Sequence, residues 1–245
     1  MTPGQAIVTT SWDDGHPLDL RVAAVLASHG LRGTFYLPLR PVAGQVLSGA
    51  EMRELLRMGM EIGSHTVTHR VLTDLPDSAI DREMRDSRRA LEDTLGAEVT
   101  SFCYPNGRFN SRVSRRAALA GYRVSRTTVD FHTSARFDPG RMPVSMHLFP
   151  HSRSAHCRHA LRHRNWSGFW NWYGRLGGEM DPERSAGRML DTVARRGGVF
   201  HLWGHSWEIE EHGLWPLFER LAARMDEAAN AVPMTNGEVG YAAQS

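Results

Sequence analysis

Apolar and polar positions along the chain form two alternating patterns, short apolar runs and longer amphipathic segments, and glycines mark many of the boundaries between them. Short apolar runs bounded by glycine are typical of buried strands, and apolar residues three or four positions apart are typical of helices. The predicted strands are Ile7–Trp12, Gly33–Leu37, Met60–Ile62, Val99–Tyr104, Tyr122–Thr127, Met142–His147 and Val199–Gly204, with a short apolar run at Ala231–Met234. The predicted helices are Leu18–His29, Glu51–Met58, Asp77–Leu95, Ser111–Ala120, Pro182–Arg195 and Leu214–Ala228.

This alternation of strands and helices predicts an α/β protein built from βα units with about seven or eight parallel strands. No internal repeat or linker interrupts the pattern, so we expect a single domain over residues 1–245, with an aromatic and basic insertion at about 148–180. In a barrel of such units the carboxyl ends of the strands carry the chemistry. Asp13, Asp14, Asn106 and His205 all lie at predicted strand ends.

Composition excludes several classes of protein. The net charge of +2 is too small to indicate binding to nucleic acid or to an anionic membrane surface. Two cysteines provide neither a disulfide framework nor a zinc-finger pattern. No apolar stretch approaches the roughly 18 residues that a membrane span needs, and the first five residues contain no signal-peptide pattern. We therefore expect a cytoplasmic protein without a membrane or nucleic-acid partner.

Two adjacent carboxylates, Asp13 and Asp14, follow the first predicted strand. Successive strand residues face opposite sides, so both can reach one site only if the chain turns there, and Gly15 permits such a turn. The alternative is a solvated Asp-Asp-Gly turn without function.

Two histidines, His65 and His69, lie four residues apart behind Ser64, which is a plausible helix N-cap. On a helix both rings would share one face and could bind one cation at about 2.0–2.1 Å. Two surface histidines on a helix are the alternative. Taken with the Asp pair, however, they offer one carboxylate and two imidazoles for a metal, with a spare carboxylate beside it, which is the minimum set for metal-assisted hydrolysis.

Several sequence strings resemble the motifs of the polysaccharide deacetylase superfamily, the NodB-homology fold of carbohydrate esterase family 4. The resemblance extends over about residues 6–240 and rests on Thr10–Gly15, Gly33–Tyr36, Glu61–His69, Phe102–Gly107 and Val199–His205. It implies a distorted (β/α)7-type barrel. It also implies one divalent metal ion held by Asp14, His65 and His69, with Asp13 as general base and His205 as general acid.

The same resemblance assigns residues that face the substrate. The backbone N–H of Asn106 is at the position of an oxyanion donor, Trp203 is at that of an apolar acetyl-pocket residue, and Tyr104 belongs to the same motif as Asn106. His201 shares a strand face with His205, but we expect it to be a deeper, hydrogen-bonded core histidine. By ligand type the metal is expected to be Zn²⁺, with Co²⁺, Ni²⁺ or Mn²⁺ as alternatives.

Two positions depart from the family pattern. Many members have an arginine that pairs with the catalytic aspartate, whereas this chain has Cys103 there, and Arg126 or Arg108 would have to replace it. The fourth motif, an Asp followed by Trp, is represented at best by Val129–Phe131. A nucleophilic role for Cys103 is not expected, because a buried cysteine more often acts as a small apolar residue.

The insertion is rich in His and Arg over 151–164 and then carries five aromatic residues, Trp166, Phe169, Trp170, Trp172 and Tyr173. One hypothesis is a lid whose rings stack on a sugar and whose cations bind a carboxylate or phosphate. The other is a pair of amphipathic helices that pack on the barrel or on a partner subunit. Trp207 and Glu208, just after His205, are candidates for either the site rim or a structural role.

The sequence therefore predicts a metal-dependent amidohydrolase that removes an N-acyl group, expected to be N-acetyl, from an amino sugar or a related small molecule. The expected partner is a small N-acylated saccharide, and formation of a homo-oligomer is left open. One alternative is another C–N hydrolase on this fold, such as a deformylase or a cyclic-imide or ureide hydrolase. Another is a carbohydrate-binding pseudoenzyme.

Overall fold

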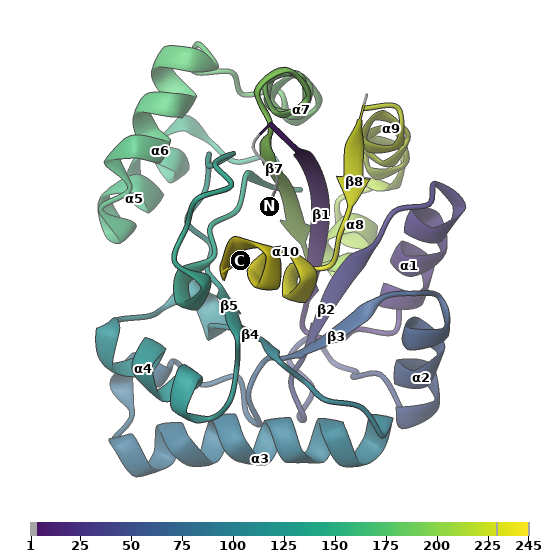
Figure 1. Ribbon diagram of the computed structural model, residues 1–245, viewed down its shortest axis with the longest axis vertical. Coiled ribbons are helices and arrows are strands. Elements are labelled where there is room, and N and C mark those ends of the chain that lie inside the picture. The colour runs from purple at the N-terminus through teal and green to yellow at the C-terminus, as the bar shows by residue number, and fades with distance from the viewer. Residues whose placement is uncertain (1–3, 229, 245) are drawn as a thin grey trace.

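Parallel strands form a curled sheet with helices on its outer side (Figure 1). The computed structural model describes residues 4–228 and 230–244. Residues 1–3, which belong to the stretch examined for a signal peptide, lie outside the described residues, as do 229 and 245. The strands are β1 Ala6–Asp13, β2 Gly33–Leu37, β3 Glu61–Ser64, β4 Ser101–Cys103, β5 Val124–Arg126, β6 Met146–His147, β7 Gly198–Gly204 and β8 Ala231–Pro233.

The helices follow the predicted amphipathic segments closely, and further helices occur in the insertion, after β7 and near the end of the chain. They are α1 Asp19–Ser28, α2 Gly49–Arg57, α3 Asp77–Leu95, α4 Ser111–Leu119, α5 Arg153–His163, α6 Trp166–Trp170, α7 Pro182–Arg196, α8 Ser206–Glu211, α9 Trp215–Asp226 and α10 Asn236–Gln244. No helix within the described ranges is both long enough and apolar enough to cross a membrane.

Seven strands follow one another in the order β5-β4-β3-β2-β1-β7-β6, which confirms the predicted (β/α)7-type architecture. β8 lies off this order and pairs with the start of β1. The predicted strand Met142–His147 is regular only at its last two residues. At its first residue, the Met142 N–H donates to Ser125 O on β5 at 2.8 Å. Further along, the Ser145 N–H donates to His201 O on β7 at 2.9 Å. This irregular segment therefore joins the two ends of the curled sheet.

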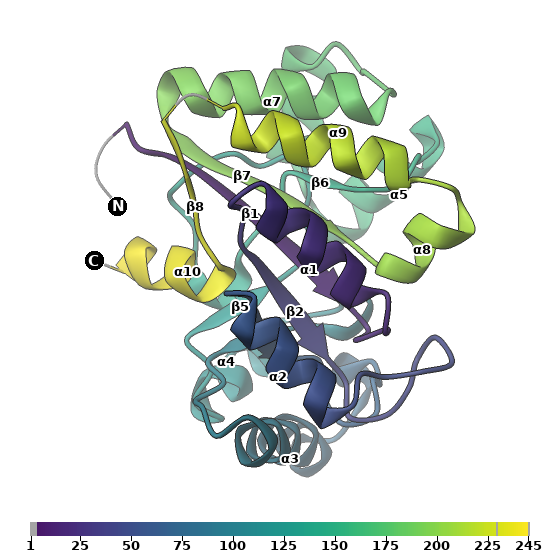
Figure 2. The same cartoon turned by 90° about the vertical axis from the view of Figure 1, so that its right-hand side faces the viewer.

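The core lies between the sheet and the helices around it, and β1 at its centre is buried along its whole length. Helix α10 packs near the amino ends of the strands (Figure 2). There the Gly237 N–H donates to Glu61 at the start of β3, and the Asn236 N–H donates to Thr34 Oγ1 near the start of β2 at 2.8 Å. The amino ends of these strands are thus occupied by a structural contact, whereas the predicted site residues lie at the opposite, carboxyl ends.

Candidate active site

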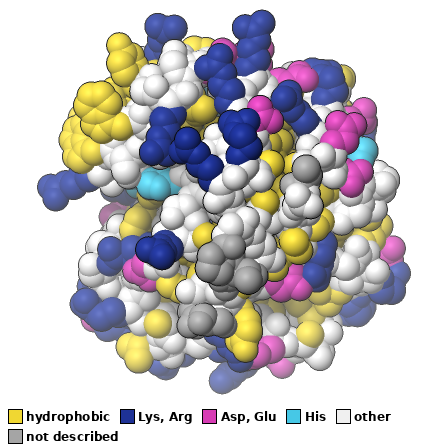
Figure 3. Space-filling view, turned by 45° about the horizontal axis from the view of Figure 1, so that its top comes forward, with side chains coloured by type: hydrophobic (Ala, Val, Ile, Leu, Met, Phe, Trp, Pro, Cys, Tyr) yellow, Lys and Arg dark blue, Asp and Glu magenta, His cyan; other side chains and the backbone are white. Residues whose placement is uncertain are grey.

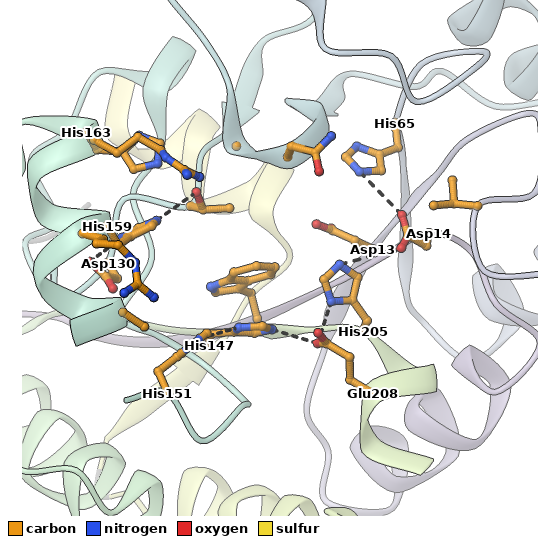
Figure 4. A pocket seen from close by; sticks show the side chains of 18 of the residues that line it. Asp13, Asp14, His65, Asp130, His147, His151, His159, His163, His205 and Glu208 are labelled. Atoms are coloured by element: carbon orange, nitrogen blue, oxygen red, sulfur yellow. Dashed lines mark hydrogen bonds and ion pairs between the residues drawn. The ribbon is translucent and has the colours of Figure 1, made fainter. Parts of the chain in front are cut away.

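A pocket of about 550 Å³ opens at the carboxyl ends of the strands (Figure 4). Every predicted site residue except Tyr104 lines this pocket, namely Asp13, Asp14, His65, His69, Asn106, Trp203 and His205. These residues come from β1, from the loops after β3 and β4, and from the end of β7 and the residue that follows it. The parallel sheet brings them together because the carboxyl ends of neighbouring strands meet at one edge.

Asp13 and Asp14 converge because the chain turns sharply at the end of β1. Asp14 has a left-handed backbone, with φ of 76°, and Gly15 follows at 63°. A Cβ atom at Gly15 would lie 2.8 Å from Leu37 Cδ2, so the packing as well as the φ angle requires glycine there. The turn carries both carboxylates into the pocket, and both are buried.

The helix predicted at His65–His69 is wrong, because this segment is an irregular loop. Thr66 and His69 have left-handed φ angles of 71° and 55°, which interrupt a helix. Glu83 of α3 stabilises the loop by accepting hydrogen bonds from the backbone N–H groups of Val67 and Thr68, both at 2.9 Å. The two imidazoles nevertheless meet, with their Nε2 atoms 3.1 Å apart.

Asp14, His65 and His69 fit a divalent cation. Asp14 Oδ1 is buried without a hydrogen-bond partner among the described residues and lies 3.6 Å from His69 Nε2 and 3.9 Å from His65 Nε2. The carbonyl of Cys103, 2.9 Å from His65 Nδ1, can only accept a hydrogen bond, so the Nδ1 atom carries the proton. Burial lowers the pKa of His65 to about 4. The Nε2 lone pair of a neutral imidazole therefore points toward the Asp14 carboxylate, as a metal ligand requires.

Asp13 is held by Arg126, a fully buried arginine at the end of β5. Arg126 on β5 is paired in register with Cys103 on β4. Cys103 stands where many family members have an arginine, so here the guanidinium comes from the neighbouring strand. The Cys103 thiol lies 3.7 Å from the other carboxylate oxygen, and burial raises its pKa well above the usual value. Arg126 thus takes over the missing arginine's contact, and Cys103 stays a protonated thiol.

The charge of Asp13 is stabilised by this pairing. Burial by itself raises the pKa of the carboxyl, but the Arg126 guanidinium and two nearby imidazoles outweigh burial and lower the pKa to about 2. The guanidinium also lies over the Trp203 ring, 4.8 Å from its centroid. Asp13 is therefore an ionised carboxylate with a fixed orientation.

His205 lies between Asp14 and Glu208, a residue whose role the sequence left open. Its Nδ1 atom is 2.7 Å from Glu208 Oε2, and its Nε2 atom is 3.8 Å from Asp14 Oδ2. Burial lowers the pKa of His205, but the hydrogen bond to Glu208 and the surrounding carboxylates raise it overall. His147 also contacts the same Glu208 oxygen, at 3.0 Å. Glu208 therefore orients two imidazoles of the pocket.

The remaining predicted residues occupy different environments. Asn106 has a left-handed φ of 55°, and its backbone N–H takes part in no hydrogen bond with the residues that the structure describes. Trp203 stacks on His147 with a centroid distance of 3.9 Å. Tyr104 is instead buried, and its hydroxyl donates to Gly140 O at 2.7 Å, so its side chain is part of the core rather than the pocket wall. His201 is buried against Ser11, as predicted for a core histidine.

The five aromatic residues of the insertion are not among the residues that line this pocket, so the pocket gives no support to the hypothesis of a lid whose rings stack on a sugar. Trp172 is buried against Phe131, and its indole N–H donates to Glu179 O at 3.0 Å. Trp166, Trp170 and Tyr173 are 56%, 64% and 61% exposed, and Figure 3 shows hydrophobic side chains gathered at the side of the molecule where α5 and α6 lie in Figure 1. From the insertion, the basic helix α5 forms part of the pocket wall instead.

Trp207 also reaches the site, since its indole N–H donates to Asp14 Oδ2 at 3.2 Å. The residues after β7 were difficult to assign from sequence because they belong to α8, a short helix with few apolar residues. The only signal was their closeness to His205 in the chain.

Comparisons with known proteins identify the family to which the chain is similar. The polysaccharide deacetylase family model matches residues 1–125. The chain is 28% identical over 128 residues to "Putative polysaccharide deacetylase YxkH" of Bacillus subtilis, a match that covers 51% of this chain and 46% of that protein. It is 31% identical over 142 residues to chitin deacetylase 1 of Cryptococcus neoformans var. grubii, covering 54% of this chain and 29% of that protein. The matches thus span less than half of either relative.

A solved structure supports the fold over the whole chain. The crystal structure of a "putative polysaccharide deacetylase" from Mycobacterium smegmatis has a TM-score of 0.64 and 14% identity, and the match covers 100% of this chain and 92% of that one. At this identity the likeness concerns the fold alone.

Proposed function

Because the chain belongs to the polysaccharide deacetylase family, we propose that it is a metal-dependent amidohydrolase that removes an N-acetyl group from an amino sugar or a related small molecule. The observation that carries this proposal is the convergence of the Asp14 carboxylate with the His65 and His69 imidazoles, beside the ionised Asp13. An amide is a poor electrophile with a poor leaving group. Its hydrolysis therefore benefits from a cation, a base and an acid in one pocket.

Asp14, His65 and His69 would hold the ion, and one carboxylate with two imidazoles favours Zn²⁺ over Co²⁺, Ni²⁺ or Mn²⁺. When bound, the ion would supply a Lewis acid that polarises the acyl carbonyl and lowers the pKa of water. Trp207 would keep the Asp14 carboxylate in position through its indole N–H. The Cys103 carbonyl would fix the tautomer of His65 in the same way.

Asp13 would act as the general base. Arg126 keeps its carboxylate charged and fixes its orientation, and the position of Asp13 next to Asp14 puts it beside the water that attacks the carbonyl carbon. As the C–O bond forms, Asp13 accepts the water proton. The free backbone N–H of Asn106 is suited to donate to the oxyanion that develops at the former carbonyl oxygen.

His205 would act as the general acid. The acetyl C–N bond breaks only if the leaving nitrogen receives a proton, because an amide anion is too basic to leave. Glu208 accepts from Nδ1, which orients the imidazole, stabilises its protonated form and leaves Nε2 directed toward Asp14. The products are a free amino sugar and acetate.

The proposal is tested by measuring product release from N-acetylated chito-oligosaccharides with protein loaded with Zn²⁺ or Co²⁺. We expect equimolar acetate and free amine, and neither product with the matched Asp14→Asn variant. Formate from an N-formyl sugar, or ring-opened product from a cyclic imide or ureide, in place of acetate would assign one of the other C–N hydrolase activities. Sugar binding without turnover would favour a pseudoenzyme, the alternative suggested by the missing family arginine, although Arg126 makes the corresponding contact with Asp13 here.

Replacement of Glu208 by glutamine is expected to lower kcat by about 10- to 100-fold, part of the roughly 10²–10⁴-fold that general acid catalysis contributes. The loss should be larger for an N-acetylated amino sugar than for an acetanilide with a good leaving group. Only the sugar's leaving nitrogen depends strongly on protonation by the general acid His205. Steady-state kinetics on both substrates checks this. Glu211→Gln on the same helix α8, an exposed position, is the control. An equal loss on both substrates would contradict the assignment.

A further inference from the structure

One face of helix α5 forms the wall of the pocket opposite the Asp and His residues. Figure 4 shows His159 and His163 of this helix across the cavity from His65 and Asp14. The positions that line the pocket are spaced by three or four residues and so share one helical face, which we call the α5 face. It consists of Ala155, His156, Arg158, His159, Arg162 and His163.

Two cations of the α5 face have no partner within the described part of the chain. The exposed side chains of Arg158 and Arg162 line the pocket but form no ion pair or hydrogen bond with a described residue. Arg112 and Arg116 of α4, in contrast, both pair with Asp77. Like charges four residues apart on a helix are mildly destabilising, so this pair is not explained by the stability of α5.

A carboxylate on the same wall does not neutralise the two arginines. Asp130 lies 3.3 Å from His159 Nδ1, 3.9 Å from His156 Nδ1 and 3.2 Å from Asn165 Nδ2. Its contacts are thus with imidazoles and an amide. Burial is the main reason why the pKa values of His156 and His163 fall to about 4, so these rings are neutral at pH 7 and available to hydrogen-bond with hydroxyl groups.

From these contacts we infer that the α5 face is a subsite for an oxyanion substituent, carboxylate or phosphoryl, on the amino-sugar substrate. Arg158 and Arg162 bind the oxyanion, since a guanidinium fork matches the geometry of both groups. The N-acetyl group lies at the Asp13 and Asp14 end of the same pocket, whose volume of about 550 Å³ is within the range of small-molecule sites. This inference rests on the proposed function and adds to it the charge class of the substrate.

The test is equilibrium binding by calorimetry at fixed ionic strength, in an Asp13→Asn background so that turnover does not consume the ligand. The probes are neutral N-acetylglucosamine, its 6-phosphate, which carries a phosphoryl group, and N-acetylmuramic acid, which carries a carboxylate. We expect at least one anionic probe to bind more tightly than the neutral sugar. Arg158→Gln/Arg162→Gln should weaken that binding about 10- to 100-fold and leave the neutral sugar unchanged.

The matched control is Arg153→Gln/Arg164→Gln, which removes the same charge at the two ends of α5 from residues that do not line the pocket. It should keep the preference for the anionic probe. A preference for only one anionic probe identifies the oxyanion as phosphoryl or carboxylate. The subsite would be overturned if the Asp13→Asn protein bound no anionic probe more tightly than the neutral sugar. It would also be overturned if both double variants lost the same affinity for the anionic probe.

Failure of the proposed function has a different signature. In that case the wild-type protein releases no acetate from any of the three probes, while the preference for an anionic probe and its loss in Arg158→Gln/Arg162→Gln are still measured. The binding result therefore judges the subsite independently of the reaction.

Discussion

Asparagine in place of Asp13 is expected to lower kcat by about 10²–10⁴-fold while the protein still binds its metal ion, because the variant loses a proton acceptor and not a ligand. Asp13 contacts Arg126 and Cys103, whereas the oxygen that faces His65 and His69 belongs to Asp14. The division of labour between these adjacent carboxylates follows from that geometry. Metal content by mass spectrometry and kcat on an N-acetylated sugar are measured on the same preparation.

The matched variant is Asp14→Asn, which should lose metal and, with it, activity. His65→Ala/His69→Ala should also lose metal while keeping the fold, because neither side chain belongs to the apolar core. His212→Ala, an exposed histidine that does not line the pocket, is the control for nonspecific loss. If Asp13→Asn were the variant that lost metal, or if the His65 and His69 double variant kept a full equivalent, the proposed roles would be exchanged or wrong.

Methionine in place of Arg126 is expected to lower the free energy of unfolding by about 3–5 kcal/mol, the usual result of removing one partner of a buried ion pair. Arg126 is fully buried and Asp13 nearly so, and the variant would leave the carboxylate without its guanidinium. Urea denaturation followed by circular dichroism gives the value.

Two further variants separate this effect from a general sensitivity of the fold. Arg220→Met removes an exposed pair with Glu183, whose side chains are 56% and 36% exposed, and should cost about 0–1 kcal/mol. Arg126→Met/Asp13→Asn should regain part of the lost stability, because no buried charge then remains unpaired. A loss below about 1 kcal/mol for Arg126→Met would mean that water or another group stabilises Asp13.

The fold was predictable because its strands and helices are marked by local patterns. A buried parallel strand is a short apolar run, and helices such as α3 and α7 have apolar residues at helical spacing. The two candidate pairs were visible for a similar reason, since Asp13 and Asp14 are adjacent and His65 and His69 are four residues apart, and the family resemblance then singled out Asp14 with the two histidines as the proposed ligands. The local structure around the histidines was not, because Thr66 and His69 adopt left-handed angles that the contacts of the loop with Glu83 help to maintain.

The sequence by itself thus determined the succession of strands and helices and the two polar pairs, Asp13 with Asp14 and His65 with His69, because each of these features depends on residues close together in the chain. Only the tertiary structure decided which residues support them. Arg126 reaches Asp13 from a position 113 residues away because the β4–β5 register sets it beside Cys103. The insertion contributes the histidines and arginines of helix α5 to the pocket wall, and not the aromatic rings that follow α5 in the chain. Such contacts join residues far apart in the chain, so they depend on how the strands pair and the helices pack and not on the pattern of any one segment.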